Sequence, residues 1–172
     1  METTLISLVS IALIIVSAVT MTVSTLQSAA KLADSWKAME KLSSSAARTE
    51  IAAIAPDNYQ GGIMDLTIQN EGQINLNNFP GWDVIVQYQS GSTCYLAYTA
   101  AYPPLANQWT VKGIYMADGF PEVFDRNILN PGERMIVSAR LSLDIGNGET
   151  ARVTLSTPNG ITSQCYVTNR LP

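Results

Sequence analysis

The chain has 172 residues, of which 47% are hydrophobic and only 14% are charged, and its formal net charge is −4. Soluble globular domains carry about 25% charged residues, so the composition argues against a disordered chain and against a simple cytosolic enzyme. The chain contains no histidine, the most common general base and zinc ligand. With 10 basic and 14 acidic residues it offers no basic patch for phosphates, so nucleic acid is not an expected partner.

An uninterrupted apolar run follows the first two residues. Residues 3–30 contain no charged side chain and consist mainly of Leu, Ile, Val and Ala, with Ser and Thr between them. As a helix, this run is roughly 42 Å long, which exceeds the roughly 30 Å hydrocarbon core of a membrane. Because the run is apolar on every face, it needs lipid or protein all around it.

A signal peptide or signal anchor is the alternative interpretation of this run. Signal peptides begin with basic residues, contain a shorter apolar stretch and end at small residues. Here the chain begins Met1-Glu2, and its first basic residue is Lys31. We therefore expect a retained helix from which a short leader has already been removed.

The helical pattern continues past the apolar run. Residues 31–54 contain neither Gly nor Pro, and their large apolar side chains recur at the three- and four-residue steps of a helix, at Leu32, Trp36, Met39 and Leu42. We expect one helix over about residues 3–53, roughly 75 Å long and far longer than one membrane crossing. This predicts a helical domain over residues 1–55 and an outer domain over residues 56–172.

Beyond Pro56 the apolar period changes from 3.6 to 2. In residues 135–145 the odd positions are apolar and most of their neighbours are polar, the pattern of a half-buried strand. Gly146-Asn147-Gly148 predicts a hairpin turn into a return strand, and Pro158-Asn159-Gly160 predicts a second turn. The other expected strands cover residues 63–69, 82–89, 93–99 and 161–168.

These short strands predict an antiparallel β-sandwich or barrel, and we expect an immunoglobulin-like sandwich. The predicted fold class is therefore α+β, with a long hydrophobic N-terminal α-helix followed by a β head. Residues 1–50 carry four acidic and four basic side chains, so the whole acidic excess lies in the rest of the chain.

Both cysteines lie inside expected strands. By alternation Cys94 faces the same way as Leu96, and Cys165 faces the same way as Val167. Two inward cysteines in an exported β domain favour a disulfide, and two buried free thiols are the alternative. A metal site is disfavoured because two sulfurs without histidine are too few ligands.

This organisation resembles the type IV pilin-like superfamily, and within it the archaellins most closely. The start Thr4-Leu5-Ile6, followed by an apolar run with Ser and Thr, is similar to the start of a mature pilin or archaellin. In the head, Asn70-Glu71-Gly72, Asn130-Pro131-Gly132-Glu133 and Thr157-Pro158-Asn159-Gly160 resemble archaellin features. Bacterial type IV pilins have a glutamate at position five and a helix-breaking proline. Here Leu5 and the absence of proline before Pro56 favour the archaellin side.

The resemblance implies a structural subunit and not an enzyme, with no cofactor. A prepilin peptidase would remove its leader, the helix would reside in the cytoplasmic membrane, and an assembly platform would insert it into an extracellular motility filament made of many copies. The side chains expected in the filament core are Met1, Glu2, Leu5, Ile6, Leu8, Val9, Ile11, Ala12, Leu13, Ile14, Ile15, Val16, Val19 and Val23. The expected helix interface consists of Leu32, Trp36, Met39 and Leu42.

Glu2 departs from the archaellin pattern. An ionised carboxylate in an apolar bundle costs several kcal/mol unless it is paired. One hypothesis pairs Glu2 with the α-amino group of Met1 on its own or a neighbouring subunit, and the alternative is that Glu2 only stabilises the start of its own helix.

Other functions remain as alternatives. The chain could be an adhesive pilus subunit, or a single-pass anchored extracellular binding domain that never polymerises. Asp118, Glu122 and Asp125 could hold a cation, but a solvated acidic loop is the favoured interpretation because their spacing fits no calcium motif. Ser43-Ser44-Ser45 beside Lys41 could suggest a nucleophile, although small serines on a packing helix are more often contact points for neighbouring helices.

Overall fold

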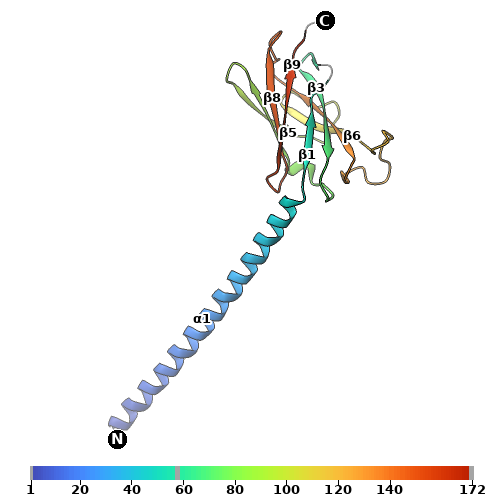
Figure 1. Ribbon diagram of the computed structural model, residues 1–172. Coiled ribbons are helices and arrows are strands. Elements are labelled where there is room, and N and C mark those ends of the chain that lie inside the picture. Colours follow the sequence, from blue (N-terminus) through green and yellow to red (C-terminus); the bar gives the residue numbers. More distant parts are fainter. Residues whose placement is uncertain (1, 57–58, 171–172) are drawn as a thin grey trace. The chain divides into compact units, whose positions relative to one another are not determined.

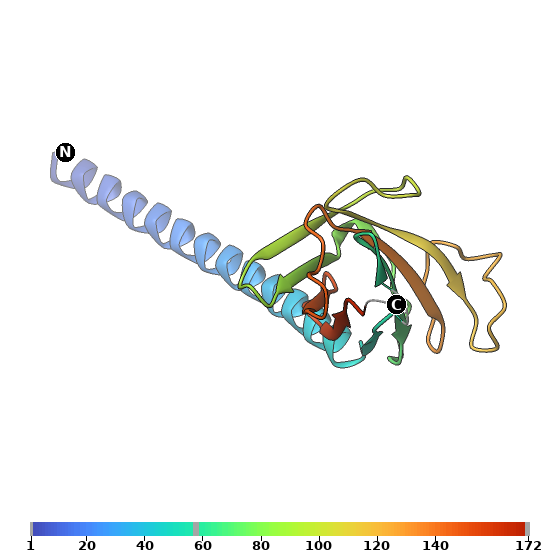
Figure 2. The same cartoon turned by 90° about the horizontal axis from the view of Figure 1, so that it is seen from above.

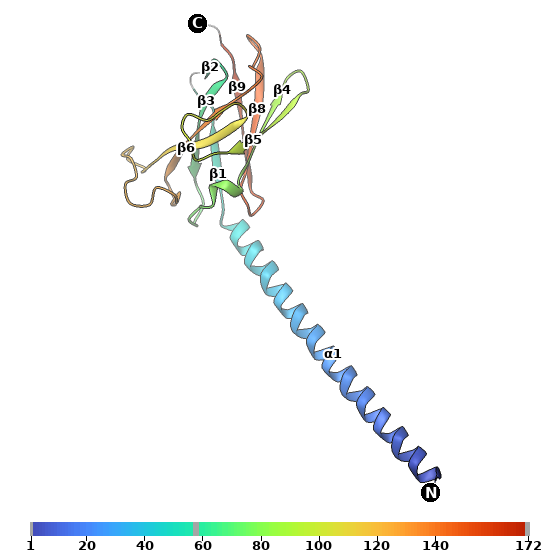
Figure 3. The same ribbon diagram turned by 180° about the vertical axis from the view of Figure 1, so that it is seen from behind.

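The computed structural model of this chain describes residues 2–56 and 59–170, without the side chains of residues 2, 4, 5 and 60. The chain divides into two compact units, Met1–Ser44 and Ser45–Pro172. We call the second unit the head. The helix and all strands except β7 are labelled in Figure 1 or Figure 3.

The elements run in the order of one long helix and then a series of short strands. Their bounds are α1 (Glu2–Ala47), β1 (Ile51–Ile54), β2 (Tyr59–Gln60), β3 (Ile63–Asn70), the 3-10 turn η1 (Phe79–Gly81), β4 (Asp83–Tyr88), β5 (Thr93–Tyr98), β6 (Gln108–Tyr115), β7 (Arg134–Arg140), β8 (Thr150–Ser156) and β9 (Thr162–Thr168). This order confirms the predicted α+β fold class.

The helix α1 is continuous over 46 residues, which corresponds to about 69 Å. Its continuity follows from the absence of Gly and Pro before Pro56, since these are the residues that most disfavour a helix interior. The last turn of α1, residues 45–47, belongs to the head.

The predicted end of the helix near residue 53 is wrong. The helix ends at Ala47, and Ile51–Ile54 form β1, which pairs with β3 in antiparallel register. Ala52 and Ala53 have high helix propensity, but pairing with a long neighbouring strand overrides that local preference. The boundary between the two units accordingly falls at Ser44 and Ser45, ahead of residue 55.

The head is a single sheet folded into two layers, with the strand order β1-β3-β7-β6-β5-β4-β8-β9 and β2 paired to β3. All pairs are antiparallel except β5 and β6, which run parallel where Ala97 stands opposite Gln108 and Tyr98 stands opposite Trp109. The two ends of this order meet where the backbone N–H of Ala53 in β1 donates to Ser163 Oγ in β9 at 2.9 Å. The view from above in Figure 2 shows this nearly closed, barrel-like sandwich.

The core lies between the two layers and is filled by alternate residues of each strand. Leu66 of β3 stands opposite Val137 of β7, and Val86 of β4 opposite Val153 of β8, and all four are fully buried. Trp109 of β6 is also fully buried and meets the ring of Tyr98 edge to face. The period-2 pattern therefore correctly indicates which faces are inside.

Two features of the strands differ from the sequence prediction. The strand expected over residues 135–145 ends at Arg140, and β7 pairs with β3 and β6 instead of forming a hairpin with β8. After Arg140 the backbone bonds to loops, because Leu141 N–H donates to the carbonyl of Gly62 and Ser142 N–H to Asn107 Oδ1. Strand β6 was not predicted, since an irregularity between Val111 and Gly113 breaks its alternation.

Candidate functional site

The expected filament-core residues lie on α1 and form an exposed apolar surface. Within the described side chains, all of them are solvent-exposed: Ile6, Leu8, Val9, Ile11, Ala12, Leu13, Ile14, Ile15, Val16, Val19 and Val23. Met1 and the side chains of Glu2 and Leu5 lie outside the described residues. An exposed surface of this length and composition is stable only when lipid or other helices cover it.

Hydroxyl side chains interrupt this apolar surface without leaving polar groups unpaired. Ser10, Ser17 and Thr20 each donate to the backbone carbonyl four residues earlier, at 2.8–2.9 Å, and Thr22, Ser24, Thr25 and Ser28 do the same. Because these hydroxyls are satisfied within the helix, they can enter lipid or a helix–helix contact at low cost.

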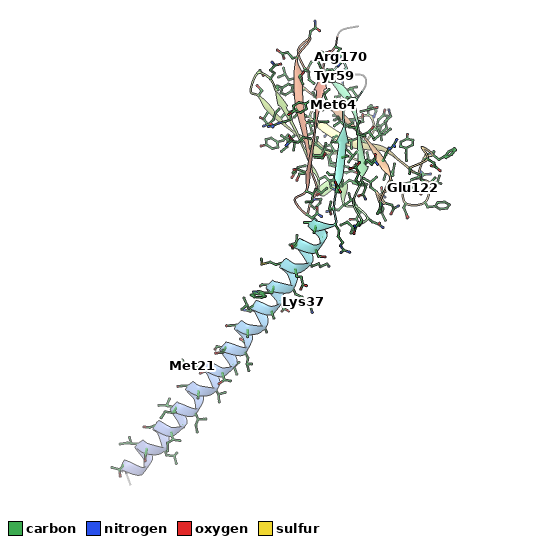
Figure 4. The ribbon with its side chains drawn as sticks, viewed as in Figure 1. Met21, Lys37, Tyr59, Met64, Glu122 and Arg170 are labelled. Carbon is green, nitrogen blue, oxygen red and sulfur yellow. The ribbon has the colours of Figure 1, made fainter. Side chains whose placement is uncertain are left out.

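The expected helix interface continues the apolar surface along the second half of α1. Leu32, Trp36, Met39 and Leu42 are all exposed, with Trp36 at 70%. Their three- and four-residue spacing places them on one side of the helix. Figure 4 shows the side chains of α1 projecting outward from the helix, with Met21 and Lys37 labelled.

Among the described residues, one helix is long and apolar enough to cross a membrane, and it is the segment Ile6–Ala47 of α1. A single crossing requires about 20 apolar residues. The apolar surface of α1, with the stripe from Leu32 to Leu42, is therefore longer than one crossing requires.

Asn70 is a buried asparagine whose hydrogen bonds are satisfied. Its Nδ2 donates to the carbonyls of Ile74 and Leu129, both at 2.9 Å, and its Oδ1 accepts from the N–H of Gly72 at 3.1 Å. The N–H of Gly132 donates to the Asn70 carbonyl at 2.8 Å. The Asn70-Glu71-Gly72 and Asn130-Pro131-Gly132-Glu133 sequences are thus joined in one network.

Gly72 makes a close approach that no other residue can make. A Cβ at this position would lie 2.6 Å from both the carbonyl oxygen of Arg48 and the backbone nitrogen of Glu50. The chain leaving α1 therefore packs directly on the turn after β3, where the N–H of Gly72 also donates to the Glu50 carbonyl at 3.0 Å.

Asn159, in the turn between β8 and β9, bonds to the chain around the end of α1. Its Nδ2 donates to Thr49 Oγ1 at 2.6 Å and to Ser45 Oγ at 3.3 Å. The turn itself is closed by Thr157, whose N–H donates to the Ile161 carbonyl. Two of the sequence features that resembled archaellins, at Gly72 and Asn159, thus hold the first residues of the head against its sheet, and the third, the turn at Gly132, bonds to Asn70.

The predicted Cys94–Cys165 disulfide is wrong, because both cysteines are free thiols. Cys94 stands opposite Val86, which stands opposite Val153, which stands opposite Cys165. Two strands therefore separate the cysteines, and the distance between them is roughly 14 Å at normal strand spacing, twice what a disulfide spans. Alternation correctly indicated that both face inward, but it could not indicate which strands are neighbours.

Burial controls the chemistry of these thiols. It raises the pKa of Cys165 to about 11 and also raises the pKa of the less buried Cys94. Since the thiolate is the reactive form, the raised pKa of each thiol makes both cysteines less reactive near neutral pH than an ordinary exposed cysteine. Cys165 packs in the core as a small apolar side chain, whereas the partly buried Cys94 donates from Sγ to Asn107 Oδ1 at 3.2 Å.

The acidic loop directs its carboxylates to its own backbone. Asp118 Oδ1 accepts from the N–H of Phe120 at 3.2 Å, and Glu122 Oε1 accepts from the N–H groups of Phe124 and Asp125 at 2.7 and 3.2 Å. These backbone donors lower the pKa of Glu122. Within the described part of the chain, no group of three or more His, Cys, Asp or Glu side chains is arranged to hold a metal ion.

The same loop carries an exposed feature that was not predicted from the sequence. Phe120, Val123 and Phe124 all point into solvent, and Phe124 is 94% exposed. Two phenylalanines among acidic residues, outside any alternating pattern, were the available signal.

No family model and no curated protein sequence matches this chain. The solved structures that resemble it include the archaellum periplasmic stator protein FlaG from Sulfolobus acidocaldarius, with a TM-score of 0.52 and 19% identity over 69% of this chain and 98% of that chain. The stator complex of FlaF and FlaG from the same organism matches with the same TM-score and identity, over 69% of this chain and 88% of that chain.

The archaeal flagellum of Methanospirillum hungatei strain JF1 also matches, with a TM-score of 0.48 and 15% identity over 95% of this chain and 91% of that chain. At these identities the two Sulfolobus similarities show a shared fold. The TM-score of the Methanospirillum match is too low to indicate a shared fold.

Proposed function

We propose that this chain is a structural, non-enzymatic subunit of an archaellum-type machine, and that it polymerises through α1 into a surface filament. The observation that carries this proposal is the exposed apolar surface of α1 from Ile6 to Leu42, about 54 Å of helix. Lipid can cover about 30 Å of that length. Packing of α1 against other copies of α1 would cover all of it.

The energetics of this step are those of helix packing. A helix that moves from lipid into a bundle gains little from the hydrophobic effect, since lipid is as apolar as the bundle. Close packing and interhelical contacts must therefore stabilise the filament, and the small Ser, Thr and Ala side chains of α1 permit close approach. The proposed partners are many copies of the same chain, with a prepilin peptidase and a membrane assembly platform acting transiently.

The start of the helix has a proposed role in the same packing. If a leader is cleaved before Met1, Glu2 would compensate the α-amino charge of Met1 on its own or a neighbouring copy, because both charges would otherwise lie unpaired in an apolar bundle. The alternative is that Glu2 only stabilises the N-terminus of its own helix.

A second candidate function is that of a membrane-anchored stator subunit, whose head stays outside the membrane while α1 remains within it. The similarity of the fold to FlaG, called a stator protein in Sulfolobus, favours this candidate. In that role part of α1 would cross the membrane, and the stripe from Leu32 to Leu42 would contact other subunits.

Fractionation separates the two candidates. Surface filaments are sheared from cells, and the chain is quantified by mass spectrometry in the filaments and in the membranes. A filament subunit is expected to be a major filament component, whereas a stator subunit stays in the membranes of sheared cells. Electron microscopy of the filaments and a swimming assay on a deletion strain then separate motility from adhesion. If the chain is found only in membranes and its deletion strain swims normally, both candidates are contradicted and an anchored binding domain is favoured.

A further inference from the structure

Two surfaces of the head, on different elements, have complementary chemistry. The first is the apolar tip, which we define as Phe120, Val123 and Phe124 in the loop between β6 and β7. All three side chains are exposed. Figure 4 shows this loop projecting from the head, with Glu122 labelled on it.

Hydrogen bonds hold the apolar tip in this exposed position. The Glu122 N–H donates to the carbonyl of Ile114 at 2.8 Å, and the Met116 N–H donates to the carbonyl of Phe120 at 2.8 Å, so both sides of the tip are bonded back toward β6. The carboxylates of Asp118 and Glu122 cap the turns on either side of Phe120. A preorganised loop loses little conformational entropy when it binds, so this loop is suited to contact a partner.

The surroundings of the apolar tip are negatively charged. Asp118, Glu122 and Asp125 flank it, against the single positive charge of Arg126. Hydrogen bonds from backbone N–H groups lower the pKa of Glu122 and keep it ionised. A partner for the tip should therefore present an apolar or aromatic recess with a cation.

The second surface combines a cation and an exposed aromatic ring with neutral polar side chains. On the outer side of β4, β5, β8 and β9 lies a hollow of about 570 Å³. We call it the arginine hollow; its lining includes Gln87, Tyr88, Gln89, Thr150, Arg152 and Tyr166. Arg152 is the charged residue among the described residues that line it, and the Tyr166 side chain is 63% exposed. Exposed Tyr and Arg side chains are the residues that most often dominate protein contacts.

Arg152 is positioned and still able to bind. Its Nε donates to Gln87 Oε1 at 2.9 Å, and its Nη2 donates to the same oxygen. Arg152 stands between Gln87 and Tyr166 across the strands. An arginine has five N–H donors, so donors remain for a carboxylate after the guanidinium is oriented by Gln87. The hollow thus offers an oriented cation beside an aromatic ring.

The two surfaces lie on opposite sides of the head. Figures 1 and 2 show the loop after β6 on one side, and the β4–β5 turn with β8 on the other. A loop on one side cannot reach the hollow on the other side of the same head. Two different surfaces that join copies head to tail form a heterologous contact, which propagates instead of closing as a dimer does.

We propose that the apolar tip of one copy docks into the arginine hollow of a second copy, with the loop carboxylates next to Arg152. The proposal rests on the proposed function, since it describes how neighbouring heads associate when α1 has brought copies together. Charge complementarity selects a second copy as the partner. The acidic flanks of the tip oppose docking on an anionic lipid surface.

Cysteine crosslinking of the full chain tests this contact in its native membranes and in filaments. Phe124→Cys is combined with Gln89→Cys, because both positions are exposed. A heterologous contact is expected to give a ladder of disulfide-linked oligomers, whereas an isologous contact stops at dimers. The matched control replaces Phe124→Cys by Leu105→Cys, an exposed position outside both surfaces, and should give at least about tenfold less ladder.

Charge reversal tests the electrostatic part of the contact. In the crosslinking background, Arg152→Glu is expected to lower the ladder about tenfold, and the further substitution Asp125→Arg is expected to restore most of it. No ladder, a ladder equal to the Leu105→Cys control, or a ladder insensitive to both charge changes would overturn the proposal. The proposal would also be overturned if the double-cysteine variant gave no ladder while the wild-type chain bound anionic vesicles and lost that binding on Phe124→Ala.

The outcomes separate this inference from the proposed function. A ladder in membranes from a chain that never enters filaments supports the head contact and contradicts the filament role. Filaments that form normally without a ladder contradict the head contact alone.

Discussion

In the head, the side chains of Leu66, Val86 and Trp109 are fully buried, whereas in α1 those of Ile14 and Trp36 are 67% and 70% exposed. Both regions are rich in apolar residues, but only the head finds partners for them within one chain. A strand can bury its apolar face on other strands of its own sheet, while a single helix that is apolar on all sides cannot. The head therefore contains the information for its own fold, and α1 depends on lipid or on other molecules.

Assembly should be the property most sensitive to substitution in α1. Ile14→Asp places a carboxylate in the apolar surface, at a cost of about 2.5–3.5 kcal/mol in a membrane. We expect this variant to form no filaments while the head keeps its native circular dichroism. Ile11→Asp should behave in the same way, and Ile14→Val serves as the control. Normal filaments from either Asp variant would show that α1 is not the core of the assembly.

The reverse experiment targets the head. Leu66→Ala removes a fully buried side chain of β3, and such substitutions cost about 2–5 kcal/mol. The head's thermal unfolding should shift to lower temperature, and membrane insertion of α1 should be unchanged. Leu105→Ala, at an exposed position, should leave the unfolding temperature within error. If Leu66→Ala also reduced the membrane insertion of α1, the two regions would be coupled.

A smaller loss of head stability is expected for Asn70→Ala. This substitution leaves the carbonyls of Ile74 and Leu129 without the amide donor that they share, at a cost of about 1–3 kcal/mol. Chemical denaturation of the full chain in detergent measures it, with the exposed Asn147→Ala as control. A change no larger than that of the control would mean that water replaces the amide.

The second half of α1, with the stripe from Leu32 to Leu42, should contribute less to helix association than the apolar run before it. Trp36→Ala removes the largest side chain of the exposed stripe and is expected to weaken helix association by about 1 kcal/mol, roughly fivefold. The measurement is the dissociation of purified filaments or oligomers with rising detergent, compared with Lys37→Ala next to it. Equal dissociation of the two variants would place the stripe outside the interface.

The smallest effect concerns the thiols, whose state tests the head's strand order. In the unreduced native chain both cysteines should resist maleimide at pH 7.5, and labelling should accelerate as pH rises toward 11, because the raised pKa of Cys165 keeps it a neutral thiol below that value. After denaturation without reductant both positions should label fully. An unlabelled pair at that stage would indicate a disulfide and a different strand order.

The same pKa shift has a defined sign for stability. In the folded protein Cys165 retains its proton up to about pH 11, whereas in the unfolded chain a cysteine loses its proton near pH 8.5. The folded state therefore binds more protons between these values, and stability should fall as pH rises through that window.

Local patterns were sufficient for part of this structure. The absence of Gly and Pro before Pro56 and the unbroken apolar run determine a long helix that no single head can bury. The alternation in β3, β4, β5, β8 and β9 determines which side chains enter the core, Cys94 and Cys165 included. These properties depend on near neighbours along the chain, so the sequence alone contains them.

The remaining features depended on which distant segments meet. Alternation places Cys94 and Cys165 inside but does not specify strand order. Only the pairing of β4 with β8 shows that two strands lie between the cysteines, which puts them too far apart for a disulfide. Likewise, Ala52 and Ala53 favour a helix until β3 pairs with them. The apolar tip on one side of the head and Arg152 on the other become complementary surfaces only after folding, because the relation between them is set by the three-dimensional arrangement of the sheet and not by their positions in the sequence.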